Sequence, residues 1–140
     1  MEKLSSFLGK ADKFDALFYV GGHGPMFALA IDKDSQQRIK EFYEAGKIVS
    51  AVCHCLIVFA DVKMSDGSYL VKDQQMTGVT NEEEDQAGLS KVLPFLLETK
   101  VKDNGAKFTE TGPGGGACCQ GWQEREDDHW ANSGKCGANW

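Results

Sequence analysis

The sequence contains no apolar stretch long enough to cross a membrane and no excess of positive charge. Among its 140 residues, 41% are hydrophobic and 26% are charged, which is the composition of an ordinary globular domain. No apolar run approaches the roughly 18 residues that a membrane span needs, and the N-terminus lacks the apolar core of a signal peptide. The net charge of −6 argues against nucleic acid and anionic membranes as partners, because both repel an acidic domain. We therefore expect a cytoplasmic protein that binds neither a nucleic acid nor a membrane.

The cysteines lack the pattern of a disulfide framework and of a zinc site. They fall into two groups, which are Cys53 with Cys55 and, much later, Cys118, Cys119 and Cys136. An odd number of cysteines in a chain expected in the cytosol does not favour disulfides. Cys-x-Cys and Cys-Cys also lack the spacer that usually separates paired zinc ligands. We expect no metal ion and no other cofactor.

The first half of the sequence alternates between short apolar runs of strand type and amphipathic helical runs. We expect strands over residues 15–20 and 48–52, a helix over 36–45, and a buried helix over 56–60. Asp34 and Ser35 are plausible N-caps of the first helix, and Gly46 is its natural stop. This order predicts a parallel sheet with helices on its faces.

The second half predicts shorter elements and then a change of character. We expect a turn at Asp66-Gly67, short strands over residues 69–71, 76–80 and 106–109, a helix that begins with the acidic turn 82–84, and a helix over 94–102. After Pro113 the chain becomes rich in glycine and polar residues and shows no helical or strand periodicity. The prediction is one domain over residues 1–113, followed by a mostly irregular tail over 114–140.

The strongest chemical signal is Cys53, which follows directly on the strand over residues 48–52. A nucleophile at a sharp turn from strand to helix is held exposed near the positive end of the helix, where backbone N–H groups can also bind an oxyanion. The alternative is that Cys53 is a small buried hydrophobic residue. His54 is the obvious base for Cys53, yet sequence neighbours at a helix start point in different directions. His54 would then orient a substrate, lie against the sheet or face solvent.

The second signal is the run Gly21-Gly22-His23-Gly24-Pro25 after the first predicted strand. Glycines there allow close backbone approach, and loops at the carboxyl edge of an α/β sheet commonly bind ligands. The alternative is an ordinary glycine-rich connection. It is not a phosphate loop, since neither Lys-Ser nor Lys-Thr follows. We interpret the acidic run over residues 82–85 as a solvated helix start rather than a source of a catalytic acid.

Taken together, several segments resemble the ThiJ/PfpI superfamily. They are Phe18–Met26, Ala51–His54, Asp66–Leu70, Thr80–Glu84 and Val92–Glu98, and they occur in the family's order over about residues 10–113. The resemblance is strongest to the branch of glutathione-independent glyoxalases, which are also described as stress chaperones and as class I glutamine-amidotransferase-like proteins. It implies a flavodoxin-like three-layer α/β sandwich with a mostly parallel sheet, incomplete in this chain, and a homodimer as the usual assembly.

The resemblance also implies a reaction and its residues. The reaction is conversion of methylglyoxal to D-lactate without a cofactor, through a hemithioacetal on cysteine. Cys53 is then the nucleophile and His54 the neighbouring catalytic histidine, while Gly22, His23 and Gly24 form the oxyanion and substrate-binding loop. The backbone N–H groups of Gly22 and His54 are the implied oxyanion donors. The alternative function is that of a catalytically impaired relative, acting as a redox-sensitive stress or chaperone-like protein.

Two departures from the family concern the site and the sheet. The family begins with a long segment that carries early strands and a glutamate in contact with the cysteine, and we expect neither to have a counterpart here. Their absence predicts an open, apolar sheet edge. In addition, Cys55 stands where the family has glycine. It would strain the elbow, crowd the pocket or serve as a resolving thiol for an oxidised Cys53.

A third departure is the tail, which abandons the family's Ile-Thr-Gly-Gln-x-Pro-Ala-Ser signature. Degenerate codons for residues 128–136, read one nucleotide later, permit most of that signature. We therefore expect the tail to be out-of-frame translation of a family gene. Sequencing the encoding DNA tests this expectation, because stop codons scattered through the shifted frame would contradict it.

Overall fold

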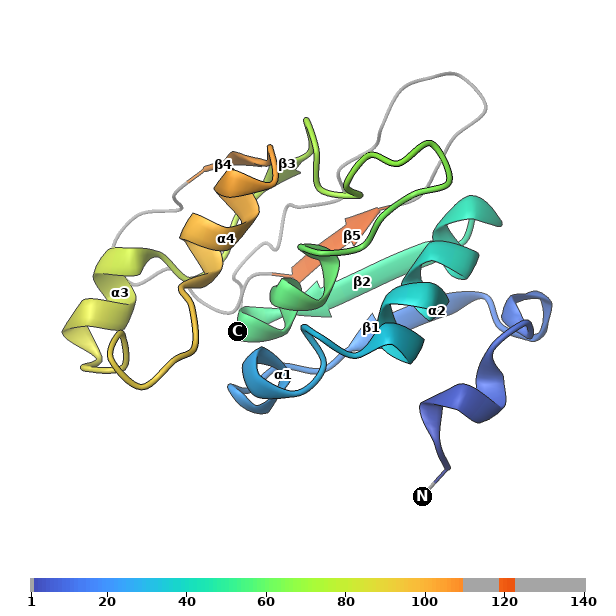
Figure 1. Ribbon diagram of the computed structural model, residues 1–140, viewed down its shortest axis with the longest axis horizontal. Coiled ribbons are helices and arrows are strands. Elements are labelled where there is room, and N and C mark those ends of the chain that lie inside the picture. Colours follow the sequence, from blue (N-terminus) through green and yellow to red (C-terminus); the bar gives the residue numbers. More distant parts are fainter. Residues whose placement is uncertain (1, 110–118, 123–140) are drawn as a thin grey trace, which may run out of the picture.

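The computed structural model describes residues 2–109 and 119–122, and it contains two small sheets (Figure 1). In the larger sheet β1 (Ala16–Tyr19) runs parallel to β2 (Ile48–Val52), and β2 pairs antiparallel with β5 (Cys119–Trp122). In the smaller sheet β3 (Gln75–Met76) runs parallel to β4 (Lys107–Phe108). The predicted parallel pairing of the two main strands is confirmed, and β2 spans the residues expected of it.

Seven helical segments connect these strands within the described residues. The α-helices are α1 (Gly24–Phe27), α2 (Lys33–Glu44), α3 (Asn81–Gln86) and α4 (Leu97–Asp103). The 3-10 helices are η1 (Leu4–Phe7), η2 (Ala11–Lys13) and η3 (Cys53–Phe59). The expected helix over residues 56–60 is therefore a 3-10 helix that starts at the cysteine, and its apolar residues are buried on all sides.

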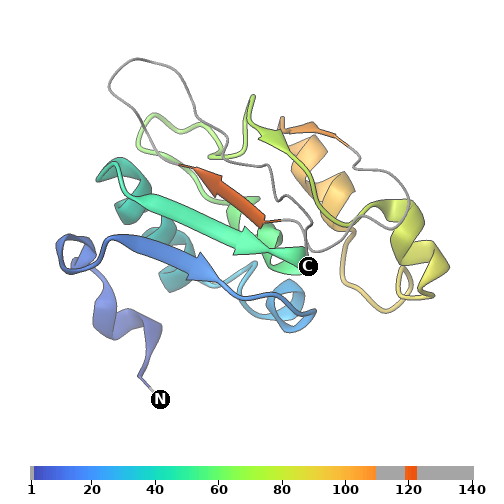
Figure 2. The same ribbon diagram turned by 180° about the vertical axis from the view of Figure 1, so that it is seen from behind.

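The helices cover only one face of the larger sheet, as the view from behind shows (Figure 2). On the covered face Val49 and Ala51 are 0% exposed. On the opposite face Phe18 is 54% and Val20 71% exposed. Successive strand residues point to opposite faces, so β1 is buried on one side only. The apolar run over residues 15–20 predicts a buried strand, and this prediction is wrong for the uncovered face of β1.

Helix α2 illustrates how local sequence sets an element's limits. It starts three residues earlier than predicted, because the side chain of Asp32 is the N-cap and accepts a hydrogen bond from the backbone N–H of Ser35. Asp34 and Ser35 instead lie inside the first turn. Gly46 ends the helix as expected, with a φ of +68° and an N–H that bonds the Tyr43 carbonyl.

The second half of the chain follows the predicted order with shorter elements. Residues 69–71 form no strand beyond one bridge between Lys63 and Tyr69. Leu70 and Val71 are buried by packing against the core, which explains their apolar character without sheet pairing. Helix α4 starts at Leu97, since Leu96 before it is extended, and Pro94 lies in the preceding loop. The predicted turn at Asp66-Gly67 is present, with Gly67 at a φ of +86°.

Strand β5 departs from the expectation for the tail. Its four residues pair with β2 from Val49 to Val52, so part of the tail joins the sheet. A strand that adds to a sheet edge is held by backbone hydrogen bonds. Because these bonds do not depend on side chains, the pattern of apolar residues in the sequence does not predict such a strand. The edge of β2 is therefore paired, whereas β1 is an edge strand of this sheet among the described residues. The rest of the tail, with Cys118 and Cys136 and the segment over 128–136 on which the out-of-frame expectation rests, lies outside the described residues.

The N-cap assignment can be tested with matched variants. Asp32→Ala removes the side chain that accepts the Ser35 N–H, so we expect the free energy of unfolding to fall by about 1 kcal/mol. Asp34→Ala removes a carboxylate from the same first turn that is not the cap, so we expect less than half of that loss. Urea unfolding of both variants measures the difference. Equal losses would contradict the assignment of Asp32 as the N-cap.

Candidate active site

The cysteine elbow is a sharp turn with an unusual backbone angle. Cys53 follows β2 directly and has a φ of 60°, one of two positive values among the described non-glycine residues. Such an angle is unfavourable for a residue with a Cβ atom and persists only where the surroundings enforce it. The thiol is half-buried rather than part of the core. This geometry supports the nucleophile elbow over the alternative of a small buried hydrophobic residue.

The glycine loop lies against the elbow, as expected for neighbouring strand ends. A Cβ atom built on Gly21 would lie 3.1 Å from the Cβ of Cys53, so a larger residue there would have to push the elbow aside by a few tenths of an ångström. Gly22 has a φ of +105°, which also favours glycine. Gly24 is the first residue of α1, and the region around its missing side chain is open. Because Gly21 lies so close to Cys53, the run over residues 21–25 is part of the elbow's surroundings rather than an ordinary glycine-rich connection.

His54 contacts the thiol in spite of being its sequence neighbour. The Sγ atom of Cys53 lies 3.3 Å from Nδ1 of His54, within hydrogen-bond reach for sulfur. The expectation that the two side chains diverge assumes regular helical angles, and the positive φ at Cys53 breaks that assumption. His54 is 6% exposed, so the imidazole is held inside the site rather than turned to solvent.

A third side chain completes the arrangement. The carboxylate of Glu84, on α3, is hydrogen-bonded through Oε1 to Nε2 of His54, and Glu84 is only 1% exposed. A carboxylate on the far nitrogen fixes the imidazole's orientation and stabilises its protonated form. The described residues thus contain a Cys53–His54–Glu84 triad. The interpretation of the acidic run as a solvated helix start was wrong for Glu84.

The position of Glu84 follows from how α3 begins. Thr80 is the N-cap, its Oγ1 accepts from the N–H of Glu83, and the Glu83 carboxylate accepts from the N–H of Thr80. This capping box occupies Glu83, while Glu82 is exposed to solvent. Residues on a helix are about 100° apart, so the next carboxylate points elsewhere, here into the site. The sequence does contain one sign of this arrangement, which is the Thr-x-x-Glu pattern of Thr80 and Glu83. The pattern assigns Glu83 to the cap, and it therefore leaves the neighbouring Glu84 free to point inward.

His23 covers one face of the His54 imidazole ring. Its ring lies over that of His54, with the ring centroids 3.9 Å apart. The side chain of His23 is exposed, so it lies between the triad and solvent. The structure therefore brings together Cys53, His54 and His23 from the predicted set. The proposed oxyanion role of the Gly22 and His54 N–H groups stays a prediction.

Cys55 lies in the core and not in the pocket. It is 1% exposed, and burial, with a smaller effect of Cys53, raises the pKa of its thiol to about 11. The expectation that Cys55 crowds the pocket is therefore wrong, because its side chain packs with the apolar residues behind the elbow. Its role as a resolving thiol stays a prediction.

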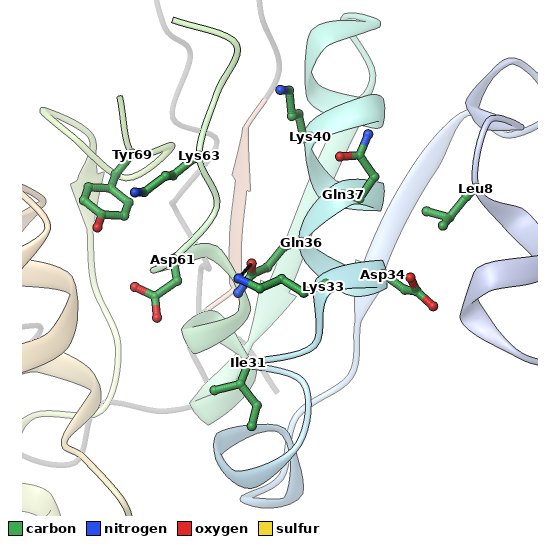
Figure 3. A pocket seen from close by; sticks show the side chains of 10 residues that line it. All are labelled: Leu8, Ile31, Lys33, Asp34, Gln36, Gln37, Lys40, Asp61, Lys63 and Tyr69. Carbon is green, nitrogen blue, oxygen red and sulfur yellow. Dashed lines mark hydrogen bonds between the residues drawn. The ribbon is translucent and has the colours of Figure 1, made fainter. Parts of the chain in front are cut away.

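One hollow on the surface lies away from the triad and the glycine loop. It has a volume of about 720 Å³ and is open to solvent between α2 and residues 61–69 (Figure 3). Its charged residues carry both signs: Lys33, Lys40, Lys63, Asp34 and Asp61. None of the lining residues belongs to the triad or to the glycine loop, so this hollow is not part of the candidate site. Among the described residues, no helix is long and apolar enough to span a membrane.

Comparison with known proteins identifies the family. The sequence pattern of the DJ-1/PfpI family matches residues 8–114. The chain belongs to this family. It is 33% identical over 102 residues to "Glyoxalase 3" of Candida albicans, an alignment that covers 69% of this chain and 43% of that protein. It is 31% identical over 103 residues to "Glutathione-independent glyoxalase HSP31" of Saccharomyces cerevisiae, covering 70% of this chain and 44% of that protein.

Solved structures agree with this DJ-1/PfpI assignment. The crystal structure of glyoxalase III from Candida albicans has a TM-score of 0.67 at 31% identity, covering 74% of this chain and 46% of that one. The Francisella tularensis Rapid Encystment Protein 24 KDa has a TM-score of 0.72 at 26% identity, covering 83% of this chain and 50% of that one. The predicted family and an incomplete flavodoxin-like α/β fold are thus confirmed. The chain spans half or less of the length of these relatives.

The two cysteines of the elbow should differ in reactivity. At pH 8 a thiol with a pKa near 11 is ionised in about one molecule in a thousand, and Cys55 is also buried. We expect iodoacetamide to modify the half-buried Cys53 first and to leave Cys55 unmodified until the chain unfolds. Mass-spectrometric peptide mapping over time distinguishes the two sites. Equal rates in the folded chain would show that the buried position of Cys55 is wrong.

Proposed function

We propose that this protein is a glutathione-independent glyoxalase, which converts methylglyoxal to D-lactate on Cys53. The single observation that carries the proposal is the Cys53–His54–Glu84 arrangement in a chain whose relatives bear that name. A thiol, a base within reach of it and a carboxylate behind the base are the parts that nucleophilic catalysis needs. The substrate is a small carbonyl compound, and the site uses no cofactor.

The first step is activation and attack. His54 Nδ1 takes the proton of the Cys53 thiol, and Glu84 stabilises the imidazolium through Nε2–H. The thiolate adds to the aldehyde carbon of methylglyoxal, and the oxygen takes up a proton to give a hemithioacetal. The backbone N–H groups of Gly22 and His54 are the proposed donors to the oxyanion formed in this step.

The remaining steps return the enzyme to its starting state. His54 moves a proton from the former aldehyde carbon to the neighbouring carbonyl carbon, through an enediol, which leaves a lactoyl thioester on Cys53. Water then cleaves the thioester, releasing lactate and restoring the thiol. The sum is methylglyoxal plus water to lactic acid, with no net oxidation or reduction.

The uncovered face of the sheet supports a second candidate function. Phe18 and Val20 of this face, with Ile48 at 44% exposure, are exposed apolar residues on the sheet whose strand β2 leads into Cys53. Such a surface can hold partly unfolded proteins, so a redox-sensitive, chaperone-like role is the alternative. A homodimer, which would cover apolar surface, also stays a prediction.

The glyoxalase proposal is tested by D-lactate formation from methylglyoxal without glutathione. We expect product from the unchanged chain, and none from Cys53→Ala, because that variant lacks the attacking sulfur. Cys55→Ala is the matched control, since it removes a buried thiol two residues away and should retain activity. Folded, soluble chain that yields no D-lactate would refute the proposal. Suppression of a client protein's aggregation by that inactive chain would favour the chaperone-like role.

The role of Glu84 as a positioning residue has its own test. Glu84→Gln keeps the shape but loses the charge that stabilises the His54 imidazolium, so we expect kcat to fall about 100-fold or more with little change in KM. Glu82→Gln, on the exposed side of the same helical turn, should leave kcat within about twofold. Steady-state kinetics of both variants decide the matter. A similar loss in the two would point to a general effect on α3.

A further inference from the structure

Arg38, on α2, is a buried cation whose Nη1 atom has no hydrogen-bond acceptor among the described residues. The residue is 5% exposed, and none of the ion pairs in the described part of the chain includes it. An arginine keeps its charge at any ordinary pH, and a buried charge without an anionic partner is costly. An anionic ligand on the guanidinium group would remove this cost.

Three phenyl rings surround the guanidinium group. Its central carbon lies 5.0 Å from the ring centroid of Phe7, 5.2 Å from that of Phe42 and 5.6 Å from that of Phe14. A cation over an aromatic ring is attracted by the negative face of the ring, which explains how the buried charge is tolerated. The rings do not replace hydrogen-bond acceptors, since an arginine presents five N–H groups in a planar fork that fits a carboxylate.

A hollow of about 270 Å³ lies beside Arg38, between the N-terminal segment, the start of β1 and α2. Its other walls are apolar except at Glu2, and they consist of Leu4, Phe7, Phe14, Ala16, Leu17 and Phe42. Glu2 lines the hollow but forms no ion pair with Arg38. The volume equals that of about nine water molecules, which is enough for a ligand of roughly ten non-hydrogen atoms.

We propose that this hollow binds a small aromatic carboxylate, with the carboxylate on Arg38 and the ring among the phenyl groups. A carboxylate pairs with a guanidinium group through two parallel N–H···O bonds. Aromatic rings favour edge-to-face contacts with one another. Phe7 and Phe14 already meet in this way, with 5.9 Å between their centroids. The charge and the walls of the hollow thus select the same class of ligand.

Binding requires a small movement, because Nη1 of Arg38 is enclosed. Phe7 lies on η1, a four-residue 3-10 helix with no buried residue, so its ring is the wall that moves most easily. The flexible side chain of Arg38 can then turn its N–H groups toward the carboxylate. A bound ligand would hold η1 against α2, so we expect slower hydrogen exchange of the η1 amides in the complex.

The hollow is separate from the triad. Ala16, in its wall, pairs with Ile48 at the start of β2, whereas Cys53 follows the end of β2. Five residues of extended strand span roughly 16 Å, so the ligand does not occupy the position of a substrate on Cys53. The proposal therefore does not rest on the glyoxalase function.

Isothermal titration calorimetry of the full-length chain with phenylacetate measures the binding. We expect one site with a dissociation constant below about 1 mM. Phenylacetamide has nearly the same shape without the charge, and it should bind at least about tenfold more weakly, because charge-assisted hydrogen bonds are the stronger ones. D-lactate should also bind at least about tenfold more weakly, since it lacks the ring and would bury a hydroxyl group without a partner.

Variants test the role of each charge. Arg38→Met keeps the length of the side chain and removes its charge, so we expect the affinity for phenylacetate to fall at least about tenfold. Lys40→Met is the matched control, since it removes a cation from the same helix that lines a different hollow, and it should leave the affinity within about twofold. Glu2→Gln should strengthen binding about two- to fivefold, because it removes a like charge from the hollow.

Three outcomes would overturn the proposal. Folded chain that does not bind phenylacetate has no such site, and Arg38 is then a structural cation among the rings. Unchanged affinity in folded Arg38→Met would show that Arg38 does not hold the carboxylate. Loss of binding in Cys53→Ala would place the ligand at the triad instead. Circular dichroism checks the fold of each variant, and if Arg38→Met is unfolded, equal affinities of the unchanged chain for phenylacetate and phenylacetamide would refute the proposal.

Discussion

The left-handed backbone at Cys53 is the constraint on which the rest of the site depends. A φ of 60° at a residue with a Cβ atom bends the chain sharply between β2 and η3. The bend brings the ring of His54 back onto the thiol of its own neighbour, which regular helical angles would not do. It also favours Gly21 beside it, because a Cβ atom there would lie only 3.1 Å from the Cβ of Cys53. The positive φ of Cys53 thus brings the thiol, the imidazole of His54 and the glycine loop close to one another.

Much of the fold was predictable from sequence because its signals are local. The limits of β2, the Gly46 stop and the turn at Asp66-Gly67 each depend on residues that lie next to one another. The identity of the nucleophile was likewise accessible, since a cysteine directly after an apolar strand is a local pattern. The family segments added the order of the elements and the fold that joins them.

What escaped prediction depends on contacts between distant residues. Glu84 is buried where its carboxylate meets His54 of the elbow, which lies 30 residues away in sequence. Cys55 was expected at the pocket and lies in the core, since the turn at Cys53 decides which way each following side chain points. The pairing of β5 with β2 was missed because it uses backbone groups alone. The exposed face of β1 was also mispredicted, because its residues Phe18 and Val20 are as apolar as those of a buried strand face.

Helix α3, which carries Glu84, is expected to be less stable to heat than the core that carries Cys53 and His54. It has six residues, well below the length at which an isolated helix persists in water, and it is held by the Thr80 cap and by the bond from the Asn81 N–H to Glu98. The free energy needed to open such a segment is smaller than that needed to unfold the core around Phe59 and Val49. We therefore expect warming to separate Glu84 from His54 while the sheet is still intact. The geometry of the triad would then be lost at a lower temperature than the folded core, and it would be restored on cooling.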